Sequence, residues 1–142
     1  MRALLLVLTM SSAVGSPPQT GFLDGVCHVS ELVKGDPLDG SSVSASASPP
    51  SWYANPSRTI WAMWNGKTYT GSYKVLWFRT QGETITVTGQ RLDGAAPQMT
   101  ADMGHEPPLR VQGSALSFQS TGCWQINASA AGETLTFVVR IP

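Results

Sequence analysis

The sequence predicts an all-β protein, an immunoglobulin-like β-sandwich of about seven strands, and three observations support this fold class. Residues 122–141 form two runs of alternating polarity joined by the short link Ala130-Ala131-Gly132-Glu133, which is the pattern of a β-hairpin. Shorter runs of strand type follow one another from residue 59 onward, with turn residues between them. No window has the periodicity of an amphipathic helix. A small β-barrel is the competing architecture.

Residues 1–15 have the pattern of a cleaved export signal. Arg2 precedes an apolar run, and Ala13 and Gly15 stand at the −3 and −1 positions of a signal-peptidase site. The run is shorter than the roughly twenty residues that cross a bilayer. An ordinary N-terminal strand or helix is the alternative. We expect residues 1–15 to be removed, which leaves a secreted or extracytoplasmic chain with no transmembrane segment and the length of one domain.

Residues 16–58 are rich in Ser, Pro, Gly and Ala, a composition that is typical of a linker. Within them, residues 41–50 cannot bury enough apolar surface to order themselves. The island 25–30 interrupts this pattern and contains Cys27. We expect a mobile linker here, followed by the sandwich domain at residues 59–142.

The two cysteines predict one disulfide, Cys27 to Cys123, because an exported chain meets an oxidising environment. Two buried free thiols are the alternative. The bridge would close a loop of nearly the whole domain, and the chain-entropy estimate for such a loop approaches roughly 4.7 kcal/mol. It would also hold the Cys27 island against the body of the domain.

The expected strands before the closing hairpin are residues 59–64, 73–79, 83–90, 98–102, 109–111 and 115–118. Asn65-Gly66 is the strongest two-residue turn signal in the chain, so we expect a hairpin turn there. Residues 73–79 are apolar on both faces, as in a central strand, and residues 98–102 are expected at an edge.

The closing hairpin is expected to supply much of the core, because burying each large apolar side chain contributes about 1.5–3 kcal/mol. Its two inward faces are Trp124, Ile126 and Ala128 on the first strand, and Leu135, Phe137, Val139 and Ile141 on the second. Trp124 stands next to Cys123, an arrangement that fits an indole packed near a disulfide.

The charge balance excludes one class of partner. Nine basic and nine acidic residues cancel, and only 13% of the residues are charged. Such a chain has no electrostatic footprint for nucleic acid or for an acidic membrane surface. We therefore expect no nucleic-acid partner, and no motif indicates a cofactor.

Candidate catalytic residues are few. Asp102, His105 and Glu106 are weak candidates for a metal or acid–base site, and a solvated loop is the simpler interpretation. The chain has no Gly-x-Ser-x-Gly elbow, and bridged cysteines leave no thiolate nucleophile. A protease inhibitor that presents residues 98–113 as its reactive loop is a further alternative.

Four aromatic residues cluster where the linker meets the domain: Trp52, Tyr53, Trp61 and Trp64. Exposed aromatic side chains give a large contact area at little entropic cost, so these four are the candidate binding residues. The alternative is that they cap the open end of the sandwich. Arg91-Leu92-Asp93-Gly94 is expected to form a turn in which Arg91 and Asp93 pair.

Several motifs stand in a fixed order: Ser51-Trp52-Tyr53 with Ile60-Trp61, Lys74 to Arg79, Thr86 to Gly94, Ser120 to Ile126, and Leu135 to Val139. Over residues 26–141 this order resembles a widespread family of uncharacterised, exported bacterial proteins, and Cys27-His28-Val29-Ser30 is similar to the family's early cysteine segment. The resemblance implies a bacterial, extracytoplasmic chain. Relatives are often tethered by lipid, but this sequence lacks the lipid-attachment cysteine. The resemblance implies no activity.

These observations favour a non-enzymatic β-sandwich that binds or supports an envelope or extracellular partner. The two alternatives are a small metal-dependent or acid–base hydrolase and a secreted protease inhibitor.

Overall fold

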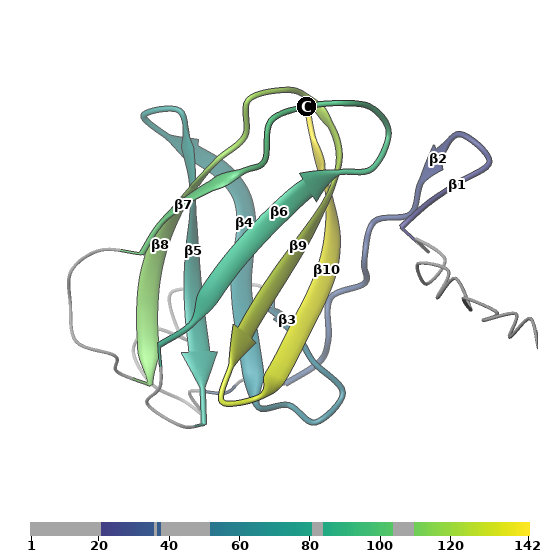
Figure 1. Cartoon of the computed structure of the whole chain (residues 1–142). Coiled ribbons are helices and arrows are strands. Elements are labelled where there is room, and N and C mark those ends of the chain that lie inside the picture. Colours follow the sequence, from purple (N-terminus) through teal and green to yellow (C-terminus); the bar gives the residue numbers. More distant parts are fainter. Residues whose placement is uncertain (1–20, 36, 38–51, 81–83, 104–109) are drawn as a thin grey trace, which may run out of the picture.

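The computed structural model describes residues 21–35, 37, 52–80, 84–103 and 110–142 (Figure 1). Within these residues all regular structure is β. The strands are β1 (Phe22–Leu23), β2 (Val26–Cys27), β3 (Trp52–Ala54), β4 (Ile60–Tyr69), β5 (Ser72–Arg79), β6 (Thr86–Arg91), β7 (Thr100–Asp102), β8 (Val111–Ser117), β9 (Gly122–Ala130) and β10 (Glu133–Ile141). In this described part, no helix has the length and apolar character needed to cross a membrane.

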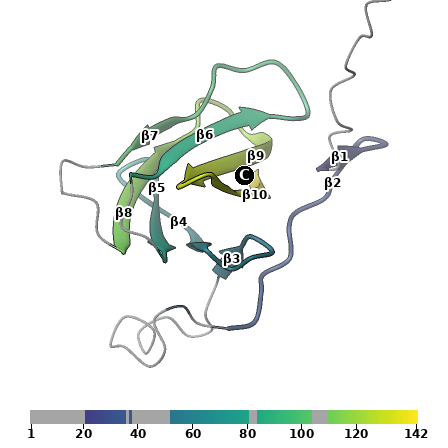
Figure 2. The ribbon, with the colours of Figure 1, turned by 60° about the horizontal axis from the view of Figure 1, so that its bottom comes forward.

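The strands form two facing sheets and one separate hairpin. One sheet has the order β3-β4-β5-β8-β7, and the other has the order β10-β9-β6. Among the described strands, β1 pairs only with β2. The seven strands from β4 to β10 follow the connectivity of a constant-type immunoglobulin domain, with β3 added beside β4. Figures 1 and 2 show the two layers face to face and not closed into a barrel. The predicted β-sandwich is therefore confirmed.

The core lies between the two sheets and follows the period-two alternation of the strands. All seven predicted inward residues of the closing hairpin are buried, from Trp124 to Ile141. They face Val75 and Trp77 of β5, the central strand of the larger sheet. The rings of Tyr53 and Phe137 stack across the interface at 4.4 Å between centroids. The hairpin thus contributes much of the buried apolar surface, as its sequence indicates.

The first hairpin of the body turns later than Asn65-Gly66, where the sequence predicts its turn. β4 continues through this pair with a bulge between Trp64 and Thr68, and Gly66 has φ of 68°. The chain reverses at Thr70-Gly71, whose φ angles of 50° and 82° are those of a type I′ turn. The Asn-Gly pair supplies positive φ as expected, but the structure uses it in a bulge.

Two further boundaries differ from the prediction. The expected strands 109–111 and 115–118 are one strand, β8, because the polar residues between them pair with β5 and Ser114 accepts a hydrogen bond from Trp77 Nε1 at 2.7 Å. The sheet also starts before residue 59, since β3 lies in the predicted linker and pairs with β4. The edge strand expected at residues 98–102 is confirmed as β7.

Residues 21–35, which we call the N-terminal strap, run along neighbouring edges of the two sheets (Figure 2). Its β1–β2 hairpin turns at Asp24-Gly25. Ser30 then exchanges two hydrogen bonds with Val138 of β10, its N donating to Val138 O at 3.0 Å and its Oγ accepting from Val138 N at 2.8 Å. Farther along, Val33 N donates to Trp52 O of β3 at 2.9 Å. The strap therefore joins β10 to β3.

Candidate functional site

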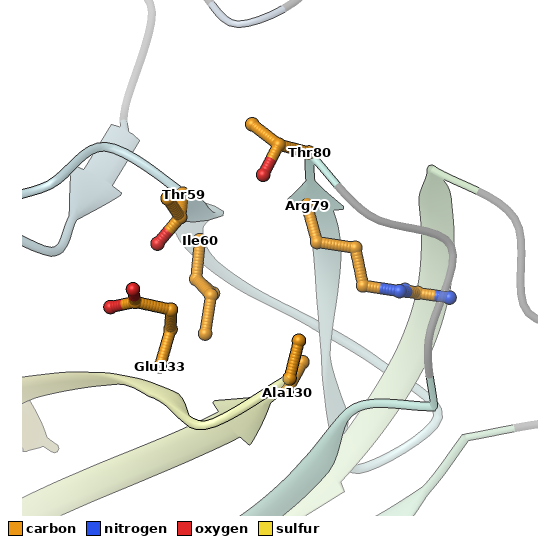
Figure 3. A pocket seen from close by; sticks show the side chains of 7 residues that line it. Thr59, Ile60, Arg79, Thr80, Ala130 and Glu133 are labelled. Atoms are coloured by element: carbon orange, nitrogen blue, oxygen red, sulfur yellow. The ribbon is translucent and has the colours of Figure 1, made fainter.

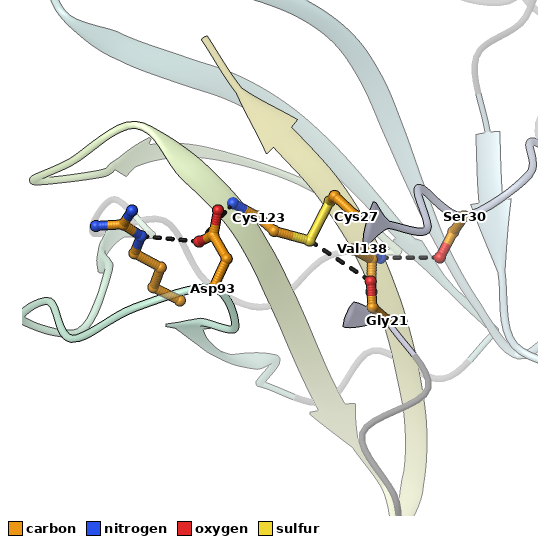
Figure 4. The surroundings of a disulfide bond; sticks show 7 residues. Gly21, Cys27, Ser30, Asp93, Cys123 and Val138 are labelled. Atoms are coloured by element: carbon orange, nitrogen blue, oxygen red, sulfur yellow. Dashed lines mark hydrogen bonds and ion pairs between the residues drawn. A yellow bond between two sulfur atoms is a disulfide. The ribbon is translucent and has the colours of Figure 1, made fainter. Parts of the chain in front are cut away.

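The predicted disulfide is present and attaches the strap to β9 (Figure 4). Cys27 of β2 is bonded to Cys123, 96 residues farther along the chain, and neither cysteine is free. Cys123 lies on the outer face of the smaller sheet, since its neighbour Trp124 points into the core. The indole and the disulfide therefore lie on opposite faces of β9, which corrects the expectation that they pack together.

The turn after β6 is fixed to the same region of β9 through Asp93. Arg91 Nε donates to Asp93 Oδ1 at 2.8 Å, and the backbone N of Cys123 donates to the same oxygen at 3.0 Å. The Arg91 guanidinium, by this hydrogen bond, holds the pKa of the Asp93 carboxyl below its usual value, and the Cys123 N–H acts in the same direction. The predicted Arg91–Asp93 pair is confirmed, and its role in the fold is structural.

Two glycines allow the close approach of these segments. A Cβ on Gly122 would lie 2.6 Å from both Arg91 Nε and Asp93 Oδ1, and Gly122 has φ of 140°. A Cβ on Gly21 would lie 2.5 Å from a methyl group of Val138. Only glycine fits at either position without displacing its neighbours.

The four predicted binding aromatics do not form an exposed surface. Trp52, Tyr53 and Trp61 are buried, with exposed fractions of 0%, 5% and 6%. Trp64 is partly buried, stacked on Tyr73 at 5.0 Å between ring centroids. The four side chains are divided by the alternation of β3 and β4. Tyr53 and Trp64 pack in the core, whereas Trp52 and Trp61 lie on the outer face of the larger sheet.

The outer pair of indoles is covered by the strap and by the turn before β4. Trp52 and Trp61 meet edge to face at 6.3 Å, and the Arg58 guanidinium lies 5.1 Å from the centre of the Trp61 ring. Arg58 Nη1 also donates to Lys34 O of the strap at 2.9 Å. The burial of these rings follows from this cover, which is formed by residues that the sequence predicts to be linker.

The weak metal candidates do not meet within the described residues. Asp102 lies on the edge strand β7, whereas His105 and Glu106 fall outside the part that the structure describes. In that part, no cluster of three or more His, Cys, Asp or Glu residues is arranged to hold a metal ion. Of the predicted inhibitor loop, residues 98–113, the middle part 104–109 is likewise outside it, whereas the two ends form β7 and the start of β8.

A small open pocket lies at one end of the sandwich, between the end of β5, the start of β4 and the β9–β10 turn (Figure 3). Its lining residues are Thr59, Ile60, Arg79, Thr80, Ala130, Ala131 and Glu133. Its volume of about 80 Å³ is well below the roughly 300–1,000 Å³ of pockets that enclose a drug-sized ligand. The pocket can hold a small chemical group, but it is too small for a whole sugar ring.

The polar wall of this pocket is held by Asn55, which is 3% exposed. Its Oδ1 accepts hydrogen bonds from the backbone N of Thr59 and of Ile60, and its Nδ2 donates to Thr59 Oγ1 at 2.8 Å. Ser57 Oγ donates to Glu133 Oε2 at 3.2 Å. These bonds orient the Thr59 and Glu133 side chains on one side of the pocket.

Arg79 forms the opposite side and is the residue that sequence reasoning missed. Its side chain is 1% exposed, and its Nε, Nη1 and Nη2 atoms are buried without a hydrogen-bond partner. Burial lowers the pKa of its guanidinium. The signal was present, because the alternation of Tyr73, Val75 and Trp77 continues inward to position 79. A charged residue at an inward position is a candidate site residue.

The strap carries most of the exposed apolar side chains of the described residues. Five large apolar side chains are exposed in the described residues, and four of them lie on the strap. These four are Leu23, Val26, Val29 and Leu32, with exposed fractions of 47–53%. The fifth is Tyr69 at the tip of the β4–β5 hairpin. Apolar exposure is therefore concentrated on one segment.

Comparison with protein-family models, with curated proteins and with solved structures finds no significant match to this chain. The site must therefore be interpreted from its own geometry.

Proposed function

We propose that this protein is a non-enzymatic, extracytoplasmic binding module of the cell envelope, and that it holds its partner through the N-terminal strap. The proposal rests on the concentration of exposed apolar side chains at Leu23, Val26, Val29 and Leu32. The disulfide supports the extracytoplasmic part of the proposal, because such bridges persist in oxidising compartments.

The partner that fits the strap is an extended, apolar segment of another envelope protein. β1 and β2 form a two-stranded sheet to which no other described strand is added, and an isolated hairpin is only marginally stable. Its free edges can accept a further strand, and its exposed apolar side chains then gain cover. The described strap carries Asp24, Glu31 and Lys34, a mixture of charges that does not favour an anionic lipid surface.

Site-specific photocrosslinking in cells tests this proposal. A photoreactive residue at Leu23 or Val29 is expected to give one discrete adduct, whereas the same residue at Lys74, exposed on the outer face of β5, gives none. The cross-linked protein is then purified and its affinity for the chain is measured. Leu23→Ser and Val29→Ser are expected to weaken binding by about tenfold or more, which is about 1.4 kcal/mol, and Lys74→Ser to leave it unchanged.

Equal adducts from Lys74, or affinities that the strap variants do not change, would contradict the proposal. Sedimentation of the purified chain tests whether the strap binds a second copy of this protein. A dimer that Leu23→Ser dissociates would replace the proposed partner with self-association.

A further inference from the structure

We propose that Asn65 is a site of spontaneous covalent modification, at which the backbone nitrogen of Gly66 attacks the side-chain amide and converts it into a carboxylate. The site lies in the bulge of β4 and is independent of the strap and of the partner proposed for it. The inference rests on the exposure of this segment, on its irregular pairing with β5 and on one backbone hydrogen bond.

The bulge releases the backbone around Asn65 from the regular ladder of the sheet. β4 pairs regularly with β5 up to Trp64 and again from Thr68. Residues 65–67 therefore stand together opposite Lys74 alone, and all three are exposed to solvent. A bulge leaves its extra residue unpaired and disrupts the ladder locally. The segment can thus change its local conformation without breaking the bonds of a regular strand pair.

Gly66 suits the role of the attacking group because it has no side chain. A Cβ on the residue after an asparagine crowds the approach of that residue's nitrogen to the asparagine side chain, whereas glycine leaves the approach open. The φ of 68° at Gly66 is one that glycine adopts without steric cost. Exposure of the segment also gives access to water, which completes the reaction.

The backbone N–H of Lys67 stabilises the charge that develops in the first step. It donates to Asn65 Oδ1 at 2.9 Å, which holds the side chain folded back on the main chain that attacks it. Attack at Asn65 Cγ places negative charge on Oδ1. A donor that is already in position lowers the energy of that charge without further reorganisation.

The reaction uses only the chain and water. The nitrogen of Gly66 forms a bond to Asn65 Cγ, the Cγ–Nδ2 bond breaks, and Nδ2 leaves as ammonia with the proton that the attacking nitrogen loses. Water then opens the cyclic imide. Cleavage of the new bond gives an ordinary aspartate, and cleavage of the original peptide bond gives an isoaspartate, whose main chain runs through Cγ. No atom is oxidised or reduced.

The other two asparagines of the chain lack these conditions. Asn55 is buried, its side chain is held by hydrogen bonds, and the following residue, Pro56, has no backbone N–H to lose. Asn127 and the following Ala128 lie within β9, where both are paired with β6 and with β10. Among the asparagines, the folded chain should therefore react at Asn65 alone.

Peptide mass mapping of the oxidised full chain, incubated at mildly alkaline pH, tests this proposal. The peptide that contains Asn65 is expected to gain the mass difference between a carboxyl and an amide, while the peptides of Asn55 and Asn127 stay unchanged. An isoaspartyl carboxyl methyltransferase with a labelled methyl donor is expected to label the same peptide. Conversion at Asn127 without conversion at Asn65 would overturn the proposal.

Two glycine variants test the attacking group. Gly66→Ala is expected to slow the conversion about tenfold or more, equivalent to about 1.4 kcal/mol in the barrier. The nearest atom to the added Cβ is 3.7 Å away, so the fold has room for it. Gly71→Ala is the matched control, since Gly71 has positive φ in the same hairpin and a Cβ there meets nothing within 4 Å. An unchanged rate in Gly66→Ala, or equal slowing in both variants, would contradict the assignment.

The same measurement on the reduced chain in urea isolates the contribution of the fold. Asn65 is expected to react at least as fast in the folded chain as in the unfolded one, whereas Asn127 reacts only when the chain is unfolded. A slower reaction of Asn65 in the folded chain would refute the role of the Lys67 N–H. Asn65→Gln, whose longer side chain does not form the five-membered imide, serves if Gly66→Ala does not fold. It is expected to abolish both the mass change and the label, and persistence of either would overturn the proposal.

Discussion

At the residue scale, Asp93 joins the turn after β6 to the beginning of β9. Its Oδ1 accepts two hydrogen bonds, one from a charged group and one from the backbone. The replacement Asp93→Asn removes the ion pair with Arg91. We expect it to lower the free energy of unfolding by about 1–2 kcal/mol at neutral pH, measured by urea denaturation. Asp24→Asn, at an exposed turn position where Asn tolerates positive φ, is the matched control and is expected to change little.

The pH dependence of this contribution follows from the lowered pKa of Asp93. A carboxyl with a lower pKa in the folded state stabilises the fold fully above its unfolded pKa of about 3.9, and loses this contribution as the pH falls through the folded value. The difference in stability between the wild type and Asp93→Asn should therefore be constant above about pH 5 and shrink in more acid solution. A difference that stays constant down to acid unfolding would contradict this assignment.

Gly122 permits the contact that Asp93 makes. Gly122→Ala adds a methyl group at a φ of 140°, 2.6 Å from Arg91 Nε and Asp93 Oδ1. We expect a loss of about 2 kcal/mol or more in the free energy of unfolding, from backbone strain and from the displaced ion pair. Gly113→Ala is the control, since a Cβ there has no neighbour within 4 Å. A similar loss at both glycines would show that the cost does not come from this contact.

Arg79 shows the limit of inference at this scale. The alternation of β5 places position 79 among the inward residues, so its burial can be predicted from the sequence. Its lack of a partner cannot, because that depends on which side chains of β4, β8 and the β9–β10 turn reach it after folding. For the aromatic residues, the sequence predicts the wrong degree of exposure. Their spacing suggested a surface, but Trp52 and Trp61 are covered by a strap that no local pattern connects to them.

At the scale of elements, the β4–β5 hairpin turns on a residue that does not favour its conformation. Thr70 has φ of 50° in a type I′ turn, where a β-branched residue is strained and Asn is preferred. Thr70→Asn is expected to raise the free energy of unfolding by about 0.5–1 kcal/mol. Thr68→Asn, within β4, should be neutral or destabilising because Asn is disfavoured in strands. A destabilised Thr70→Asn variant would show that the turn type is wrong.

The same hairpin explains why element boundaries were only partly predictable. Alternating runs predict β6, β9 and β10, a run that is apolar on both faces predicts β5, and the Ala131-Gly132 link is correctly expected to be a turn. Asn65-Gly66 was misplaced because a bulge and a hairpin turn require the same positive φ, and the choice depends on pairing between β4 and β5. β3 was missed because three residues show no usable period, and its strand conformation comes from pairing with β4.

At the scale of the whole molecule, the disulfide closes a loop across nearly the full domain. Reduction is expected to lower the free energy of unfolding by about 3–5 kcal/mol, because the unfolded chain regains the entropy of a loop of about 100 residues. The measurement is urea unfolding with and without reductant. A variant with Cys27→Ala and Cys123→Ala is the control and should not respond to reductant. An unchanged wild-type stability on reduction would contradict the expected role of the bridge.

The fold class and the cysteine pairing were accessible from the sequence, since periodicity and the presence of one cysteine pair determine them. The position of the strap was not. Two of its contacts, from Ser30 N and Val33 N, are backbone hydrogen bonds to distant strands that any sequence can make, and no local pattern marks Ser30 Oγ as the acceptor for Val138 N.

The position of the strap has a consequence for solubility. β10 spans nine residues at the margin of its sheet, whereas β3 and β7, the margins of the other sheet, span three each. A long edge strand with free backbone groups can pair with a strand of another molecule, whereas a short edge strand gives little surface for such pairing. Ser30 of the strap covers part of this edge by its hydrogen bonds with Val138, and the disulfide at Cys27 holds the strap there. Opening that linkage should therefore promote fibrous aggregation through β10 before the sandwich itself unfolds.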